Sequence, residues 1–138
     1  MKVFLDTNVL VSAFAARGLC ADVLRVVLAE HEMVIGSTVL AELTRVLQKK
    51  LGLPPATVQR AEAFLGREAV LVELAPPVSV EIRAEGDAPI LAEAVAGGAE
   101  VLVTGGRDLL DIADDALLPI LSPRAFWERL RSAPHDRH

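Results

Sequence analysis

Several residue types are scarce in this chain of 138 residues. It contains no tyrosine, one tryptophan, four phenylalanines and one cysteine. A single cysteine cannot form an internal disulfide, which excludes a fold held together by disulfide bonds. With so few aromatic side chains, a surface that recognises nucleic-acid bases by stacking is not supported.

Long apolar runs are also missing from the sequence. No run approaches the ~20 residues that a membrane-spanning helix requires, so we expect no membrane partner. The first acidic residue, Asp6, comes too early for a signal peptide. We therefore expect a cytoplasmic protein.

Histidine and lysine are too few, or too poorly placed, for two common kinds of α/β enzyme. His31 falls in a predicted turn, and His135 and His138 lie in a C-terminal segment that we expect to be loose. No histidine is thus well placed as the base of a Ser-His-Asp hydrolase. A response-regulator-like domain would need a lysine near a phosphate-accepting aspartate. The chain has only three lysines, Lys2, Lys49 and Lys50.

Apolar residues make up 52% of the chain, enough for one domain with a real core. The net charge of −5 argues against a broad nucleic-acid-binding surface. It does not exclude a nuclease, because carboxylates that hold a metal ion can present positive charge locally.

Short apolar runs alternate with helical patterns along the chain, which is typical of an α/β fold with a parallel sheet. We expect strands at 3–5, 33–35, 70–72, 101–103 and 118–121, and helices at 8–15, 20–30, 38–50, 56–66, 88–97 and after Pro123. Pro119 makes the last strand an edge strand. Functional sites in such sheets form beyond the carboxyl ends of the strands.

Acidic residues lie near several of these strand ends and helix starts. Asp6 follows the first strand, Glu42 lies at the border of the apolar face of its helix, and Asp87 precedes another helix. Asp108 follows the fourth strand, after two glycines that do not form a P-loop. Each acid also has an ordinary interpretation: a helix cap for Asp6, Asp87 or Asp108, and a solvated surface residue for Glu42.

Taken together, the four acids favour a metal site. Carboxylates gathered at one sheet edge repel one another, and a hard divalent cation removes that repulsion. Oxygen-only ligands select Mg²⁺ or Mn²⁺. Such a site is typical of enzymes that cleave phosphodiesters by in-line displacement.

These residues resemble the PIN-domain family. The resemblance is carried by the segment 5–10, by Glu42 in a helix after Ser37, by Asp87 with 90–94, and by 102–105. The segment 120–126 is similar to a bacterial branch that contains the toxin components of toxin–antitoxin pairs. The resemblance extends from about residue 1 to residue 131, and we expect 132–138 to be a flexible tail.

The resemblance implies a three-layer α/β/α sandwich with a parallel sheet of about five strands. It implies a metal-dependent endoribonuclease, a homodimer, and inhibition by a small antitoxin protein. Asp6, Glu42 and Asp87 match the first three acids of the family, and Asn8 and Thr104 match supporting polar positions. Arginines at 17, 45 and 107 are candidates for gripping RNA phosphates outside the metal site.

The sequence departs from the family pattern at two positions. Gly106 stands where this branch has an acid after Thr-Gly, and Ala88 stands where a second acid often follows Asp87. Asp108 remains as the candidate for a fourth ligand. The alternative hypothesis is therefore a degenerate PIN fold that binds RNA or a protein with weak or no catalysis.

Overall fold

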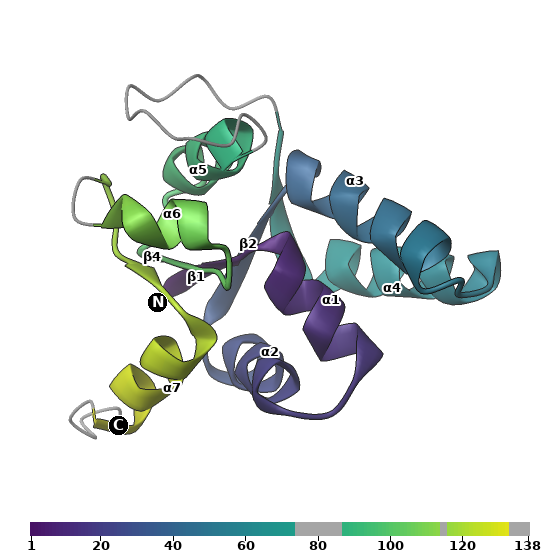
Figure 1. The fold of residues 1–138 in the computed structure, drawn as a ribbon, viewed down its shortest axis with the longest axis horizontal. Coiled ribbons are helices and arrows are strands. Elements are labelled where there is room, and N and C mark those ends of the chain that lie inside the picture. Colours follow the sequence, from purple (N-terminus) through teal and green to yellow (C-terminus); the bar gives the residue numbers. More distant parts are fainter. Residues whose placement is uncertain (74–86, 114–115, 133–138) are drawn as a thin grey trace.

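A computed structural model describes residues 1–73, 87–113 and 116–132, except the side chains of Asp87 and Ala88. Within these ranges the chain forms a sheet of five parallel strands, as predicted, and the strand order is β3-β2-β1-β4-β5 (Figure 1). The strands are β1 (Lys2–Leu5), β2 (Glu32–Gly36), β3 (Ala69–Val72), β4 (Val101–Val103) and β5 (Ile120–Leu121).

The apolar runs of β1 and β4 lie side by side near the centre of the sheet. Val3 pairs with Val101 and Leu5 with Val103, and all four side chains are fully buried. Strands covered on both faces are expected to be continuously apolar. The register aligns the carboxyl ends of β1 and β4, where Asp6 and Thr104 follow.

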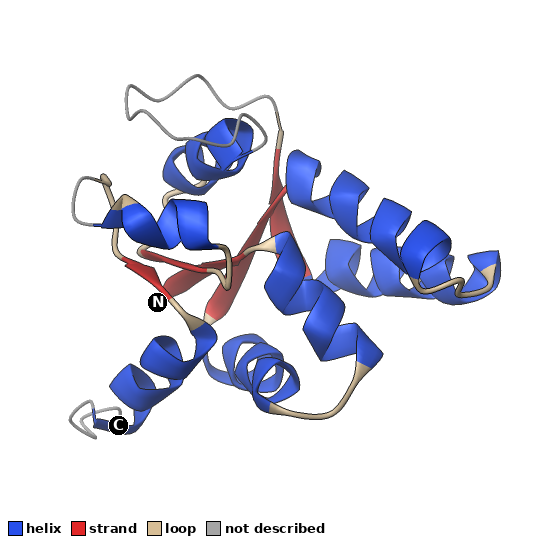
Figure 2. Ribbon diagram, viewed as in Figure 1, coloured by secondary structure: helices blue, strands red, loops and turns tan. Residues whose placement is uncertain are grey.

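Helices cover both faces of the sheet, so the three layers are as expected (Figure 2). In Figure 1, α5 and α6 lie above the sheet, and α2 and α7 lie below it. The helices are α1 (Thr7–Ala15), α2 (Leu19–Glu30), α3 (Ser37–Arg45), the π-helix η1 (Val46–Lys50), α4 (Pro55–Glu68), α5 (Asp87–Ala96), α6 (Arg107–Asp111) and α7 (Pro123–Ser132).

The segment 38–50 differs from its prediction as one α-helix. It is α-helical to Arg45 and then continues as the π-helix η1, in which the Leu51 amide donates to the Val46 carbonyl at 3.1 Å. Leu51, which α-helical periodicity would place on the buried face with Leu43 and Leu47, is 43% exposed. The wider turn changes the direction of each later side chain, so α-helical periodicity no longer applies.

The helices α7 and α3 begin with different kinds of cap residue. Ser122 caps α7, because its hydroxyl accepts a hydrogen bond from the Ala125 amide at 3.1 Å. Neither Ser37 nor Thr38, although both residue types are good caps, caps α3. Gly36 occupies the cap position, and no side chain of that residue is available to accept the free amides.

Candidate active site

Asp6 lies directly at the carboxyl end of β1, where the chain turns into α1. Its amide donates to the carbonyl of Val103 on β4 at 2.9 Å, so the sheet pairing extends to this residue. Its Oδ1 accepts a hydrogen bond from the Thr7 amide at 2.6 Å. Asp6 is therefore the cap of α1, as the ordinary interpretation predicted, but it is also 4% exposed. A cap needs no such burial.

A hydrogen-bond network holds the second oxygen of Asp6. The hydroxyl of the buried Thr104 donates to Oδ2 at 2.7 Å, and Asn8 Nδ2 lies 3.4 Å from the same oxygen. Asn8 Oδ1 in turn accepts from the Gly105 amide at 2.8 Å, and Thr104 Oγ1 accepts from the Gly106 amide at 2.9 Å. The loop after β4 thus fixes the orientation of the Asp6 carboxylate.

Glu42 is joined to the same site through Thr7. The Thr7 hydroxyl donates to Glu42 Oε1 at 2.7 Å, although the two residues are 35 positions apart. Glu42 is half-buried, as expected for the border of the apolar face of α3. Because Thr7 follows Asp6, this bond brings the two carboxylates to one place.

Asp6 and Glu42 open onto one cleft of about 490 Å³ between α1 and α3. Its polar and charged lining residues are Asp6, Thr7, Asn8, Ser12, Glu42 and Lys50. Apolar side chains of Val11, Val46, Leu51 and Ile90 complete the walls. The cleft thus combines convergent polar groups with a partly apolar wall, as ligand sites commonly do.

The electrostatics of Asp6 reflect its burial. Burial raises the pKa of Asp6 above its ordinary value, and the negative charge of Glu42 raises it further. Hydrogen bonds from Thr104, from the Thr7 amide and from Asn8 oppose this shift without cancelling it. A buried carboxyl with a raised pKa beside a second carboxylate is a frequent property of functional sites.

The other two predicted acids are placed differently. Asp87 begins α5, but its side chain lies outside the described residues. Asp108 lies in the first turn of α6 and is not its cap, which is Gly106. Asp108 is not among the described residues that line the cleft. Within the described ranges no three acidic, histidine or cysteine side chains gather as a metal-binding group.

One buried acid was missed from the sequence. Glu93 on α5 is 3% exposed and accepts hydrogen bonds from the Ser37 hydroxyl and from the amide and hydroxyl of Thr38, at 3.0–3.3 Å. It therefore caps α3 from another helix, and α3 carries Glu42. The available signal was an acid at the centre of the otherwise apolar run 90–95.

Residues 2–108 match the family model of the PIN domain, and this range contains every described residue of the cleft. The chain belongs to the PIN domain family. No curated protein sequence matches this PIN domain.

Solved structures share the fold of this PIN domain. A chain of VapBC2 from Rickettsia felis, solved with a promoter DNA fragment, matches with a TM-score of 0.63 and 19% identity, over 88% of this chain and 98% of that one. VapBC-1 from nontypeable Haemophilus influenzae matches with a TM-score of 0.62 and 19% identity, over 90% of this chain and 99% of that one. The PilT N-terminus domain protein SSO1118 from Sulfolobus solfataricus matches with a TM-score of 0.58 and 14% identity, over 100% of both chains.

The donor set of the cleft suits a hard cation. Asp6 and Glu42 offer only oxygen atoms, as does the side chain of Thr7. Mutual repulsion, seen in the effect of Glu42 on Asp6, is what a divalent cation would relieve. The described residues of this PIN domain therefore fit Mg²⁺ or Mn²⁺ better than Zn²⁺, which favours nitrogen and sulfur.

Proposed function

We propose that this PIN domain is a metal-dependent endoribonuclease and the toxin of a toxin–antitoxin pair. One observation carries the nuclease proposal: the buried Asp6 carboxylate faces a cleft together with Glu42, at the carboxyl ends of the central strands of a PIN fold. This is where open parallel sheets bind their ligands.

The predicted site residues have different parts in this proposal. Asp6 and Glu42, with Asp87, would hold Mg²⁺ or Mn²⁺, and Asp108 remains the candidate for a fourth ligand. When bound, the ion supplies an activated water and stabilises charge on the phosphate. Thr104 and Asn8 fix the Asp6 carboxylate, and Thr7 fixes Glu42. Such outer contacts orient ligands before the ion arrives.

The same comparison supports a proposal about one partner. Three of the similar solved structures are described as VapBC2, VapBC-1 and FitAcB, which supports a small antitoxin protein as partner of this chain. We also propose an RNA substrate, a homodimer and a cytoplasmic location. No helix in the described ranges has the length and apolar character needed to cross a membrane.

The decisive experiment compares wild type with Asp6→Asn on single-stranded RNA and on DNA of the same sequence. We expect RNA cleavage by wild type with Mn²⁺, loss of cleavage with EDTA, and at least a hundredfold lower rate for the variant. Asp111→Asn, on α6 and away from the described lining of the cleft, is the matched control. Full activity of a folded Asp6→Asn protein would refute the proposal.

A second candidate function is supported by Gly106. It stands where the resembling branch carries an acid, so the metal site has lost one carboxylate. A PIN domain that binds RNA or a protein without cutting would follow if the remaining acids hold no ion. Calorimetry separates the two functions: Mn²⁺ binding abolished by Asp6→Asn supports the nuclease, and no binding at millimolar Mn²⁺ supports the binding module.

A further inference from the structure

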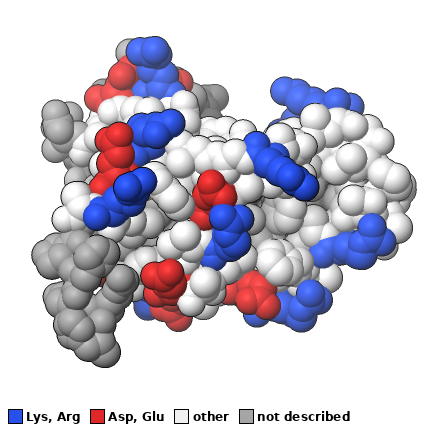
Figure 3. Space-filling view, turned by 90° about the horizontal axis from the view of Figure 1, so that it is seen from below, with Lys and Arg blue, Asp and Glu red and all other residues white. Residues whose placement is uncertain are grey.

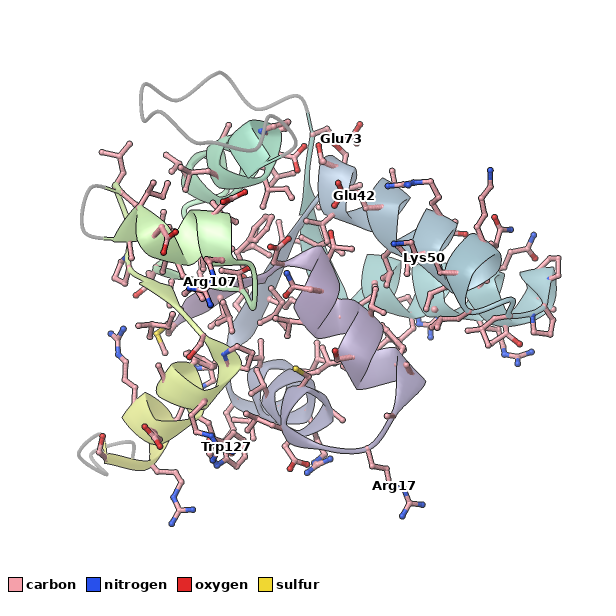
Figure 4. All side chains as sticks on the ribbon, viewed as in Figure 1. Arg17, Glu42, Lys50, Glu73, Arg107 and Trp127 are labelled. Carbon is pink, nitrogen blue, oxygen red and sulfur yellow. The ribbon has the colours of Figure 1, made fainter. Side chains whose placement is uncertain are left out.

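A lysine lies in the same cleft as the two described acids. Lys50, the last residue of η1, is the one positively charged residue among the described residues that line the cleft. Figure 4 shows Lys50 and Glu42 on the side of α3 and η1 that faces α1. The arginines that the sequence offered for phosphate binding, Arg17, Arg45 and Arg107, are not in this lining.

The π-helix explains why Lys50 faces the cleft. Lys50 follows Glu42 by eight residues, and at ~100° per residue an α-helix would carry it ~80° past two full turns. Each residue of a π-helix advances by a smaller angle, because its hydrogen bonds span five residues. The turn closed by the Leu51 amide and the Val46 carbonyl therefore returns Lys50 towards the face of Glu42.

The Lys50 ammonium is available for a ligand. It is exposed, and no salt bridge or hydrogen bond joins it to any carboxylate in 1–73, 87–113 or 116–132. Figure 3 shows basic and acidic side chains interspersed over one face, with no continuous basic area among the described residues. Lys50 is therefore the described basic group that a phosphate can contact beside the two acids of the cleft.

We propose that Lys50 binds a backbone phosphate of the RNA and fixes it relative to Asp6 and Glu42. This inference rests on the proposed nuclease function and adds a positioning contact that the acids cannot supply, since carboxylates repel phosphate. An ammonium on a long stem contacts phosphate as a point charge and carries no base specificity. Lys50 is therefore a substrate-binding residue of the cleft, independent of RNA sequence.

The test measures RNA binding without cleavage. A fluorescent single-stranded RNA is titrated with the full chain in EDTA, at several salt concentrations, for wild type, Lys50→Gln, Lys50→Arg and Lys49→Gln. Lys49 is the matched control, because it is the preceding residue, exposed, and absent from the lining of the cleft. Circular dichroism checks that each variant is folded.

We expect Lys50→Gln to weaken binding about fivefold to tenfold, equally for RNAs of different sequence. The slope of log K against log salt should fall by about 0.7, the value for one phosphate contact on a single strand. Lys50→Arg should restore both values, and Lys49→Gln should leave them unchanged. Equal affinity and salt slope for wild type and Lys50→Gln would overturn the assignment.

Cleavage kinetics separate this inference from the function on which it rests. With Mn²⁺, Lys50→Gln should raise KM with little change in kcat. Cleavage by wild type with no effect of Lys50→Gln on KM or binding would refute the role of Lys50 and leave the nuclease intact. Lys50-dependent RNA binding without any cleavage would refute the nuclease and keep Lys50 as an RNA contact of a binding module.

Discussion

Glu93 on α5 accepts a hydrogen bond from the Thr38 amide at 3.2 Å, and so joins the start of α3 to a helix 55 residues away. The first amides of a helix have no partner within the helix, and a carboxylate there also interacts favourably with the helix dipole. Since α3 carries Glu42, this contact sets the position of one wall of the cleft.

Glu93→Gln should destabilise the protein by about 1.5–3 kcal/mol, the usual value for a hydrogen bond to a charged group. The amide retains the shape of the side chain but loses the charge that accepts from Ser37 and Thr38. Urea unfolding measures the change. Glu68→Gln on the exposed end of α4 is the control and should stay within ~0.5 kcal/mol of wild type. Similar stabilities for the two variants would contradict the capping role.

Gly36→Ala should also be destabilising, because a Cβ at Gly36 would overlap Glu93 Oε1. The expected cost is about 1–3 kcal/mol, as for other overpacked sites. Gly66→Ala is the opposite case: a Cβ there meets nothing within 4 Å, and Gly66 lies within α4. It should stabilise by up to ~1 kcal/mol. Thermal unfolding of both variants measures the two changes in stability. A stabilising Gly36→Ala would show that the Glu93 side chain moves aside without cost.

The stability of metal-free Asp6→Asn relative to wild type should rise with pH. Burial raises the pKa of Asp6 in the folded state, so the ionised carboxylate costs stability there. Protonated Asp6 therefore favours the folded state. This contribution to the free energy of unfolding is fully present below the pKa of the unfolded chain, about 3.8, and is lost as pH rises through the raised pKa of the folded state. The free energy of unfolding of Asp6→Asn, relative to that of wild type, should therefore increase between these two pKa values. Urea unfolding in EDTA from pH 3.5 to 8 measures this difference in stability. A difference that is the same at every pH would contradict the raised pKa of Asp6.

Gly106→Asp should strengthen Mn²⁺ binding, on the order of tenfold, by restoring a carboxylate to the loop after β4. Gly106 has φ −78°, which any residue adopts, and a Cβ there would lie 3.2 Å from Thr104 Oγ1 and 3.6 Å from Asn8 Nδ2. The new side chain would thus begin beside the network that holds Asp6. Calorimetry with Mn²⁺ measures the affinity, and Gly106→Asn controls for size. Equal affinities for the two variants would exclude residue 106 as a ligand position.

Most of the sheet could be predicted because its strands are short apolar runs followed by polar residues. The run 3–5 is followed by Asp6, and 101–103 by Thr104, so both the central strands and the site at their ends were visible in the sequence. Pro119 correctly indicated the edge strand, since β5 lies at one end of the sheet.

The features that were missed depend on contacts between distant segments or on a change of helix type. Nothing local to Glu93 identifies Thr38 as its partner, and an acid in an apolar helix has no preferred direction until α3 is placed. Lys50 was missed for another reason: α-helical periodicity assigns it a direction that the π-turn alters. The side chain of Asp87 lies outside the described residues, so its convergence with Asp6 stays a prediction.

The bond from Thr104 to Asp6 joins residues 98 positions apart, and the neighbouring bond from the Asp6 amide reaches Val103. During synthesis the first strand leaves the ribosome before the fourth, so Asp6 cannot bond to Thr104 until residue 104 has been made. Parallel pairing over such a separation is slow to form. The candidate site is thus assembled late, and a chain truncated before residue 101 would carry Asp6 and Glu42 without the partner that aims the first of them.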